Sequence, residues 1–175
     1  MNALQQFGDD SFLGGWMKSP KRETFLMRLG AFLKIPVLNY VTPKFVEMTD
    51  AHSVLLIPLT RRTKNHVNSM YFAVLAAGAD AASGFLAARH IANTKKNIVL
   101  VFKDVHGDFL KRADSDAYFT CRNGPEIAQA VEKASETGER QNVLCEIEVT
   151  CPKTQGDEIV AHFKMTLSMK DKSKC

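Results

Sequence analysis

Apolar and polar residues alternate most regularly near the end of the chain. In "NVLCEIEVTC" and "EIVAHFKMTLSMK", residues 142–151 and 158–170, nearly every second residue is apolar. A period of two predicts antiparallel strands with one buried face, and "KTQGDE" between them predicts a hairpin connection. The β-prone segments "NIVLVFKDVHGDFLKR" and "DAYFTCR" precede them, and "GPEIAQAVEKASETG" predicts a short helix.

The first half of the chain predicts two helices and two extended segments. Apolar residues at helical spacing in residues 22–34 predict an amphipathic helix that ends before Pro36. Residues 40–60 predict two extended segments, and a long helix follows from about residue 69 to 91, with Asn68 or Ser69 as its N-cap. The long helix is the largest element available to cover the sheet, so an α+β fold is expected, in which a curved antiparallel sheet packs on one central helix. We expect a single domain over residues 1–175, with residues 1–20 peripheral.

One carboxylate lies in the middle of the long helix. Asp80 is the only formally charged residue between Val67 and Ala88. At 3.6 residues per turn it shares a stripe with small residues: Ala73, Ala76, Ala77, Ser83, Gly84 and Ala87. The stripe leaves room for a closely packed second chain or for a ligand. Asp80 is therefore either a hydrogen-bonded group in a subunit contact, or a general base or acid whose pKa an apolar cleft raises.

Polar residues gather just before this helix, in "RRTKNHVNSM". The first N–H groups of a helix have no partner within it and carry partial positive charge, so they could polarise a carbonyl as an oxyanion hole does. Nearby side chains could orient a substrate or a water molecule. The candidates are the N–H groups of Tyr71, Phe72 and Ala73, the side chains of Asn65, His66, Asn68 and Ser69, and the Tyr71 hydroxyl.

Composition narrows the function classes. The chain of 175 residues has 45% apolar and 24% charged residues and a net charge of +4, with basic residues scattered, which argues against nucleic-acid binding. The four cysteines form no C-x-x-C pair and histidines do not cluster, so no metal site is expected. The apolar run is interrupted by Asp80, which predicts a buried helix rather than a membrane span. With no signal-peptide pattern at the start, a cytoplasmic protein is expected.

Two stretches resemble a known superfamily. The order of elements, the alanine-rich helix with its aspartate, and "KDVHGDFLKRADSDAYFTC" resemble hotdog-fold acyl-CoA thioesterases. "IPLTRRTKNHVNSMY" is similar to a subgroup of uncharacterised hotdog proteins labelled as thioesterases. The resemblance covers roughly residues 23–170. It implies a curved antiparallel sheet wrapped around a long central helix, a homodimer or a homotetramer built from two dimers, and acyl-thioester sites at the subunit boundary.

The same resemblance implies roles for individual residues. In phenylacetate-type members a His-Gly-Gly turn opens the central helix, and a carboxylate about nine residues after the histidine activates water. Asp80 matches that carboxylate, whereas Tyr71, Phe72 and Ala73 stand where the turn would be. The implied catalytic residues are Asp80, Asn65 and Tyr71. The implied substrate contacts are His66, Asn68, Ser69, Met70, Phe72, Ala73, Phe102, Lys103 and His106.

Three functions remain open at this point. The first is a thioesterase that hydrolyses acyl-CoA or a related acyl thioester with water activated by Asp80, and it needs no metal or redox cofactor because CoA is part of the substrate. The second is a non-catalytic acyl-CoA or fatty-acyl binding protein on the same fold, which the missing His-Gly-Gly turn favours. The third, a hydroxyacyl-thioester dehydratase, ranks last because no histidine lies within the apolar run.

Overall fold

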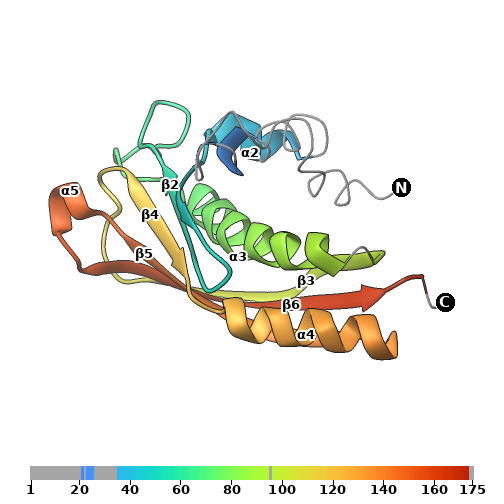
Figure 1. The fold of residues 1–175 in the computed structure, drawn as a ribbon. Helices are drawn as coiled ribbons and strands as arrows, with labels where there is room; N and C mark the ends of the chain where they lie inside the picture. Colours follow the sequence, from blue (N-terminus) through green and yellow to red (C-terminus); the bar gives the residue numbers. More distant parts are fainter. Residues whose placement is uncertain (1–20, 22, 26–34, 95, 174–175) are drawn as a thin grey trace.

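The computed structural model describes residues 21, 23–25, 35–94 and 96–173. In chain order the elements are α2 (Pro36–Val41), β1 (Lys44–Met48), β2 (Ser53–Ile57), α3 (Phe72–Thr94), β3 (Ile98–Phe109), β4 (Ala117–Cys121), α4 (Gly124–Thr137), β5 (Gln141–Thr150), α5 (Pro152–Gln155) and β6 (Ile159–Asp171). The six strands of the described part form one antiparallel sheet in the order β1-β2-β4-β5-β6-β3. The sheet curves around α3 (Figure 1), and α4 contacts both α3 and the strands β5 and β6.

The strand pattern explains which face of the sheet is buried. Along β5 and β6, Cys145 faces Met165 and Ile147 faces Phe163, and all four side chains are buried. On the other face, Glu146 lies opposite Lys164 and forms an ion pair with it at 3.4 Å. The period of two in the sequence therefore separates an inner face against the helices from an outer polar face, as predicted.

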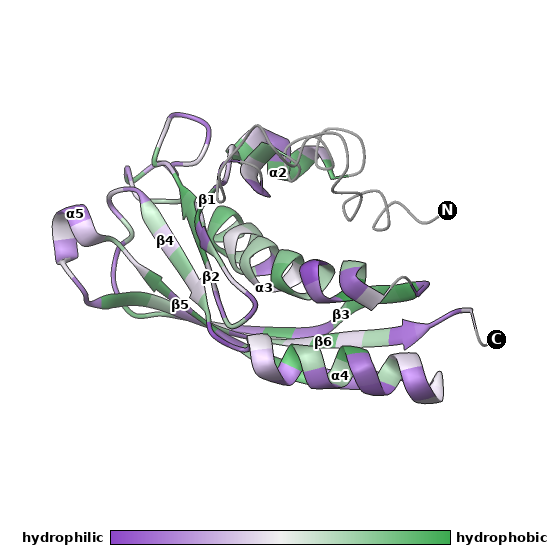
Figure 2. Ribbon diagram, in the orientation of Figure 1, coloured by the Kyte–Doolittle hydropathy of each residue, from purple (hydrophilic) through white to green (hydrophobic). Residues whose placement is uncertain are grey.

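The central helix packs tightly against the inner face. Leu75, Ala79 and Leu86 of α3 are buried, and most of the helix is hydrophobic (Figure 2). A Cβ on Gly78 would lie 2.3 Å from the Phe119 ring, so only glycine lets the helix backbone approach β4 this closely. The helix is long and apolar enough to cross a membrane by composition, but half of its most apolar stretch is buried in the protein.

The start of α3 differs from the prediction. The helix begins at Phe72, and the Tyr71 carbonyl accepts the N–H groups of Val74 and Leu75 at 2.9 and 3.1 Å. Asn68 and Ser69 are not its N-cap, because Asn68 has a φ of 60° and both residues belong to a separate loop. The chain before the helix is thus a structured turn of its own. The helix predicted over residues 22–34 and the peripheral residues 1–20 lie largely outside the described residues.

Candidate functional site

A cavity of about 340 Å³ lies at the N-terminal end of α3. We call it the helix-start cavity. Its walls are largely apolar, its lining residues include the basic side chains of His66, Lys111 and Arg112, and no carboxylate is among them. Such a cavity suits an apolar group with an anionic or polar end. The lining residues are Asn65, His66, Val67, Ser69, Met70, Tyr71, Phe72, Leu75, Phe109, Lys111, Arg112 and Ala113.

The loop that forms one wall of the cavity is held together by Asn65. Its Oδ1 accepts the N–H groups of Val67 and Ser69 at 3.0 and 3.1 Å, and its own N–H donates to the Ser69 carbonyl at 2.8 Å. This is a turn that an asparagine side chain stabilises by mimicking the backbone. Asn65 Oδ1 is therefore already occupied by the loop, and a catalytic role for this residue stays a prediction.

Two backbone donors at the helix start are available to a ligand. The Tyr71 N–H is not, because it donates to the Thr63 carbonyl at 2.8 Å. Within the described chain, the N–H groups of Phe72 and Ala73 have no acceptor, as expected for the first turn of a helix. The oxyanion-hole hypothesis thus keeps two of its three donors. The Tyr71 side chain is exposed and packs edge-on against the Phe72 ring with the centroids 4.8 Å apart.

Asp80 lies on a flank of α3 that no described element covers completely. Along this flank Ala73 is exposed, and Ala76, Ala77, Asp80 and Gly84 are partly buried. Burial raises the pKa of Asp80 to about 6, and no hydrogen bond or charge of a described residue offsets this effect. A Cβ on Gly84 would lie 3.6 Å from the Phe102 ring and 3.9 Å from Asp80 Oδ1, so this aromatic ring is near the carboxylate. The result is a carboxylate that can bind and release a proton close to neutral pH.

Asp80 and the free N–H groups lie too far apart to act on one carbonyl within a protomer. Asp80 comes eight residues after Phe72, which places it about 12 Å along the helix axis. Asp80 is not among the residues that line the helix-start cavity. A reacting carbonyl must sit about 3 Å from its oxyanion donors and from the activated water, so one chain alone does not assemble both groups.

The structure brings together only some of the predicted site residues. Six of them line the helix-start cavity: Asn65, His66, Ser69, Met70, Tyr71 and Phe72. Ala73 lies in the first turn of α3 but does not line the cavity. Asn68 does not line it either, and its Oδ1 accepts a hydrogen bond from the Lys64 ammonium at 3.0 Å. Phe102 is near Asp80 rather than near the cavity.

The structure places His106 on the face of the sheet that is turned away from the helix of its own protomer. The pairing of β3 with β6 shifts register between Phe102 and Asp104, which indicates a bulge at Lys103. Beyond it, His106 lies opposite Lys164, on the outer face of the sheet and away from α3. Its Nε2 contacts Asp108 Oδ1 at 3.2 Å. His106 therefore cannot contact a ligand held between the sheet and the helix of its own protomer, and Lys103 is an exposed residue of the bulge.

Sequence reasoning missed the other wall of the cavity. Phe109, Lys111, Arg112 and Ala113 come from the end of β3 and the connection to β4. The segment "FLKRAD" stood out as a family-like element, but neither its spacing nor its composition indicated that it contacts the start of α3. The contact depends on the sheet topology, which brings residues about forty positions apart together, as in the Arg112–Ser69 pair.

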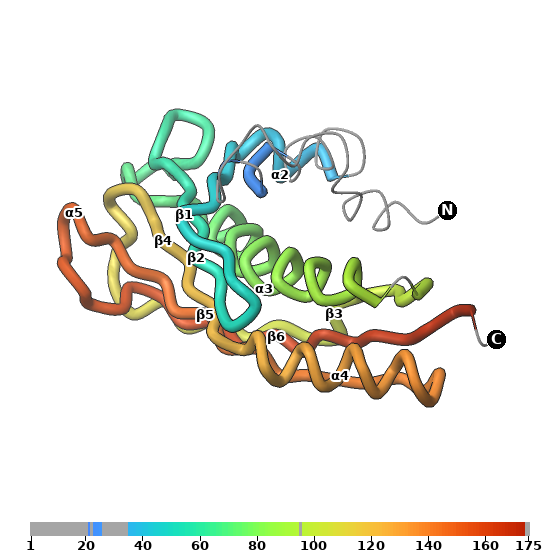
Figure 3. Tube along the Cα trace, in the orientation of Figure 1, coloured from blue at the N-terminus to red at the C-terminus, as the bar shows by residue number. Residues whose placement is uncertain are grey.

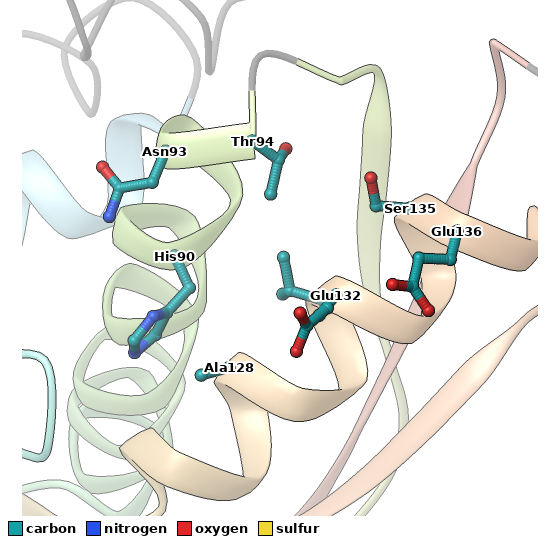
Figure 4. Close-up of a pocket in the computed structure, with 8 residues that line it drawn as sticks. His90, Asn93, Thr94, Ala128, Glu132, Ser135 and Glu136 are labelled. Atoms are coloured by element: carbon teal, nitrogen blue, oxygen red, sulfur yellow. The ribbon is translucent and has the colours of Figure 1, made fainter.

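A second hollow lies at the opposite end of α3. This helix-end groove has a volume of about 400 Å³ and lies between the last turns of α3 and the part of α4 that runs from Ala128 to Glu136 (Figure 4). It is lined by His90, Asn93, Thr94, Ala128, Val131, Glu132, Ser135 and Glu136, and none of them was predicted as a site residue. Two carboxylates make it a poor site for an anionic ligand. Among the described residues, no group of three or more His, Cys, Asp or Glu could hold a metal ion.

Comparison with models of known protein families assigns the chain to one family. The profile of a domain of unknown function, DUF4442, matches residues 24–169. The chain belongs to the DUF4442 family. The comparison with curated proteins finds no significant match.

Solved structures share the fold at low sequence identity. A Pseudomonas aeruginosa protein of unknown function, described as a probable thioesterase, is 20% identical with a TM-score of 0.68, and the match covers 85% of this chain and 95% of that one. A thioesterase from Haemophilus influenzae is 11% identical with a TM-score of 0.62, covering 82% and 88%. A protein of unknown function from Chlorobaculum tepidum is 12% identical with a TM-score of 0.71, covering 87% and 96%. The predicted hotdog fold of this DUF4442 chain is thereby confirmed.

Proposed function

We propose that this DUF4442 protein is a thioesterase that hydrolyses acyl-CoA or a related acyl thioester. The observation that carries the proposal is Asp80. It is a partly buried carboxylate with a pKa near 6, without a hydrogen-bond partner in the described chain, on a flank of small residues that no described element covers completely. A group with these properties can take a proton from water near neutral pH. The similarity to structures called thioesterases supports the same chemistry.

In the proposed reaction, Asp80 accepts one proton from a water molecule as the water oxygen attacks the thioester carbonyl carbon. The carbonyl oxygen becomes an oxyanion, to which the N–H groups of Phe72 and Ala73 donate hydrogen bonds. The C–S bond then breaks, and the leaving thiolate takes up the proton. The products are a carboxylic acid and the free thiol of CoA, and no atom changes its oxidation state, so the proposed step requires no redox cofactor.

The separation of Asp80 from the helix start supports a homodimer in which two chains complete each site. If two α3 helices pack antiparallel along the stripe, with a two-fold axis between Ala76 and Ala77, the partner's Asp80 comes opposite Ala73. The edge strand β3 favours the same assembly. It is long and unpaired on one side within the described chain, and Val101 and Val105 on it are 48% and 58% exposed. Association of two such dimers into a homotetramer, and residence in the cytoplasm, stay predictions.

The function is tested with Asp80→Asn, which keeps the size of the side chain and removes the base. We expect free thiol release from a panel of acyl-CoA thioesters to fall by about 10²–10⁴-fold, while the variant stays folded and dimeric. Glu132→Gln in the helix-end groove is the matched control and should retain wild-type turnover. Turnover by Asp80→Asn at the wild-type rate would remove Asp80 from the mechanism.

The alternative function is an acyl-CoA or fatty-acyl binding protein without catalysis. One observation favours it: the helix opens with Phe72 and Ala73 rather than with glycines, and Phe72 is 58% exposed at the cavity. These side chains restrict how closely a thioester approaches the N–H groups. Calorimetric binding of acyl-CoA by the wild-type protein, with no thiol released over hours, would establish the alternative and contradict the hydrolase.

A further inference from the structure

We propose that Arg112 is a positioning residue of the helix-start cavity, and this inference rests on the proposed thioesterase function. Arg112 belongs to the connection between β3 and β4 and lies beside the loop that leads into α3. The proposal is that its guanidinium holds this loop so that the N–H groups of Phe72 and Ala73 point at the thioester carbonyl. The role is indirect, because Arg112 acts through the loop and not through the reacting atoms.

The guanidinium grips the loop at two points. Its Nε donates to Ser69 Oγ at 3.1 Å, and its Nη2 donates to the Val67 carbonyl at 2.6 Å. Asn68, between these two acceptors, has a φ of 60°, in the left-handed region that few residues other than glycine adopt. Such a conformation persists where its surroundings impose it. Arg112 therefore binds the residues on both sides of Asn68, and a planar group with two fixed donors is suited to this task.

The backbone at Arg112 is also fixed by hydrogen bonds. The Gln155 side chain in α5 donates to the Arg112 carbonyl at 2.6 Å, and the next carbonyl, of Ala113, accepts the Met70 N–H at 2.7 Å. In Figure 3, α5 and the β3–β4 connection meet at the same end of the sheet. A continuous set of contacts thus runs from α5 through residues 112 and 113 to the residues that immediately precede α3.

The contacts of Arg112 separate it from the neighbouring lysine. Lys111 pairs with the Glu158 carboxylate, whereas the hydrogen bonds of the Arg112 side chain go to a hydroxyl and a carbonyl. The guanidinium of Arg112 therefore donates hydrogen bonds to neutral atoms of the loop, as expected for a side chain that fixes the position of the loop. An alternative role, direct binding of CoA phosphates, makes different predictions for substrates with and without phosphates.

The test compares Arg112→Ala and Arg112→Lys with Arg122→Ala, using acyl-CoA and the uncharged N-acetylcysteamine thioester of the same acyl group. Arg122 pairs with Glu148 and does not line the cavity, so it is the matched control. Misplacement of donors by about 1 Å can cost on the order of 100-fold in rate. We expect kcat to fall about 10–100-fold for both thioesters in both Arg112 variants, with KM for the neutral thioester nearly unchanged.

Arg112→Lys decides between geometry and charge, because lysine keeps the charge but cannot bind both loop acceptors in a fixed plane. Amide hydrogen exchange of residues 65–73 should also become faster in the Arg112 variants than in Arg122→Ala. Rescue by lysine, or a defect confined to KM for acyl-CoA, overturns the positioning role and leaves the proposed function intact. A wild-type protein that cleaves neither thioester overturns both.

Discussion

The two ends of α3 carry hollows of similar volume but opposite character. At the N-terminal end, the helix-start cavity has basic lining residues and two free N–H groups. At the C-terminal end, the helix-end groove has Glu132 and Glu136 among its lining residues. The helix dipole adds partial positive charge at the first end and partial negative charge at the second. Volume alone would favour the groove, at about 400 against 340 Å³, whereas charge favours the cavity for an anionic thioester.

The comparison also shows what the N-terminal end lacks. It provides donors for an oxyanion but no base, because Asp80 lies about 12 Å further along the helix. The C-terminal groove has carboxylates but no backbone N–H groups from the start of a helix among its lining residues, so it lacks the pair of donors that the N-terminal end offers to a reacting carbonyl. In the proposed homodimer, a second protomer would supply the missing base at the N-terminal end only, because the stripe of small residues would let the partner's Asp80 approach there.

The largest expected effect comes from separating the two halves of the site by mutation. Ala73→Pro removes one N–H in the first helical turn, where proline is tolerated. Loss of an oxyanion donor should lower kcat by about 10²–10³-fold. In a mixed dimer of Ala73→Pro and Asp80→Asn chains, one site receives both defects and the other receives none. We therefore expect purified heterodimers to regain about half of the wild-type activity.

The control for this experiment is each variant as a homodimer, which should remain inactive at the same concentration. Mixed dimers that are as inactive as the homodimers would show that Asp80 and the N–H groups of one chain serve the same site. That result would contradict the shared-site arrangement. A differently tagged copy of each chain allows the heterodimer to be isolated by two affinity steps.

Much of the fold was predictable because its signals are local. The period-two pattern of residues 142–151 and 158–170 gave β5 and β6 and their buried face, and the apolar run gave α3 with its central aspartate. The start of α3 was misplaced because Asn68 adopts a left-handed conformation that a capping residue does not use. Local preference alone could not show that the loop is fixed by residues far along the chain.

The orientation of His106 has a specific physical cause. Without the irregularity at Lys103, strict alternation from Leu100 and Phe102 would turn His106 toward the helix. One extra residue in β3 reverses this assignment for everything that follows it. The contacts of Arg112 could not be predicted from the sequence for a related reason, because its partners, Val67 and Ser69, are distant in sequence. Register and long-range contacts are set by packing, which no single stretch of residues encodes.

A smaller effect is expected from pH. The pKa of Asp80 in the folded protein is about 6, above the ordinary value of 3.8, because burial disfavours its charged form. In the proposed mechanism the deprotonated carboxylate is the base, so kcat should rise with pH through about 6 and then level off. The folded state binds this proton more tightly than the unfolded state, so stability falls as pH rises from 3.8 to about 6.

Asp80→Asn should therefore increase the free energy of unfolding at pH 7 by up to about 3 kcal/mol, and this gain should vanish below pH 4. Urea unfolding at pH 4, 5.5 and 7 measures the difference between the variant and the wild type. Glu132→Gln, which changes an exposed carboxylate of the helix-end groove, is measured beside it as the control variant. A gain that is equal at all three pH values would mean that the Asp80 pKa is not raised in the folded protein.

The smallest expected effect is a response to salt, which distinguishes the two ends of the helix by charge. Screening weakens the attraction between exposed charges, so raising ionic strength from 0.05 to 0.5 M should increase KM for acyl-CoA several-fold at a cavity with basic lining. The N-acetylcysteamine thioester carries no phosphates, and its KM should stay nearly constant. Binding at the acidic helix-end groove predicts the opposite trend for acyl-CoA, because salt would there reduce a repulsion. If KM falls with increasing salt for acyl-CoA but not for the N-acetylcysteamine thioester, acyl-CoA binds at the helix-end groove and not at the helix-start cavity.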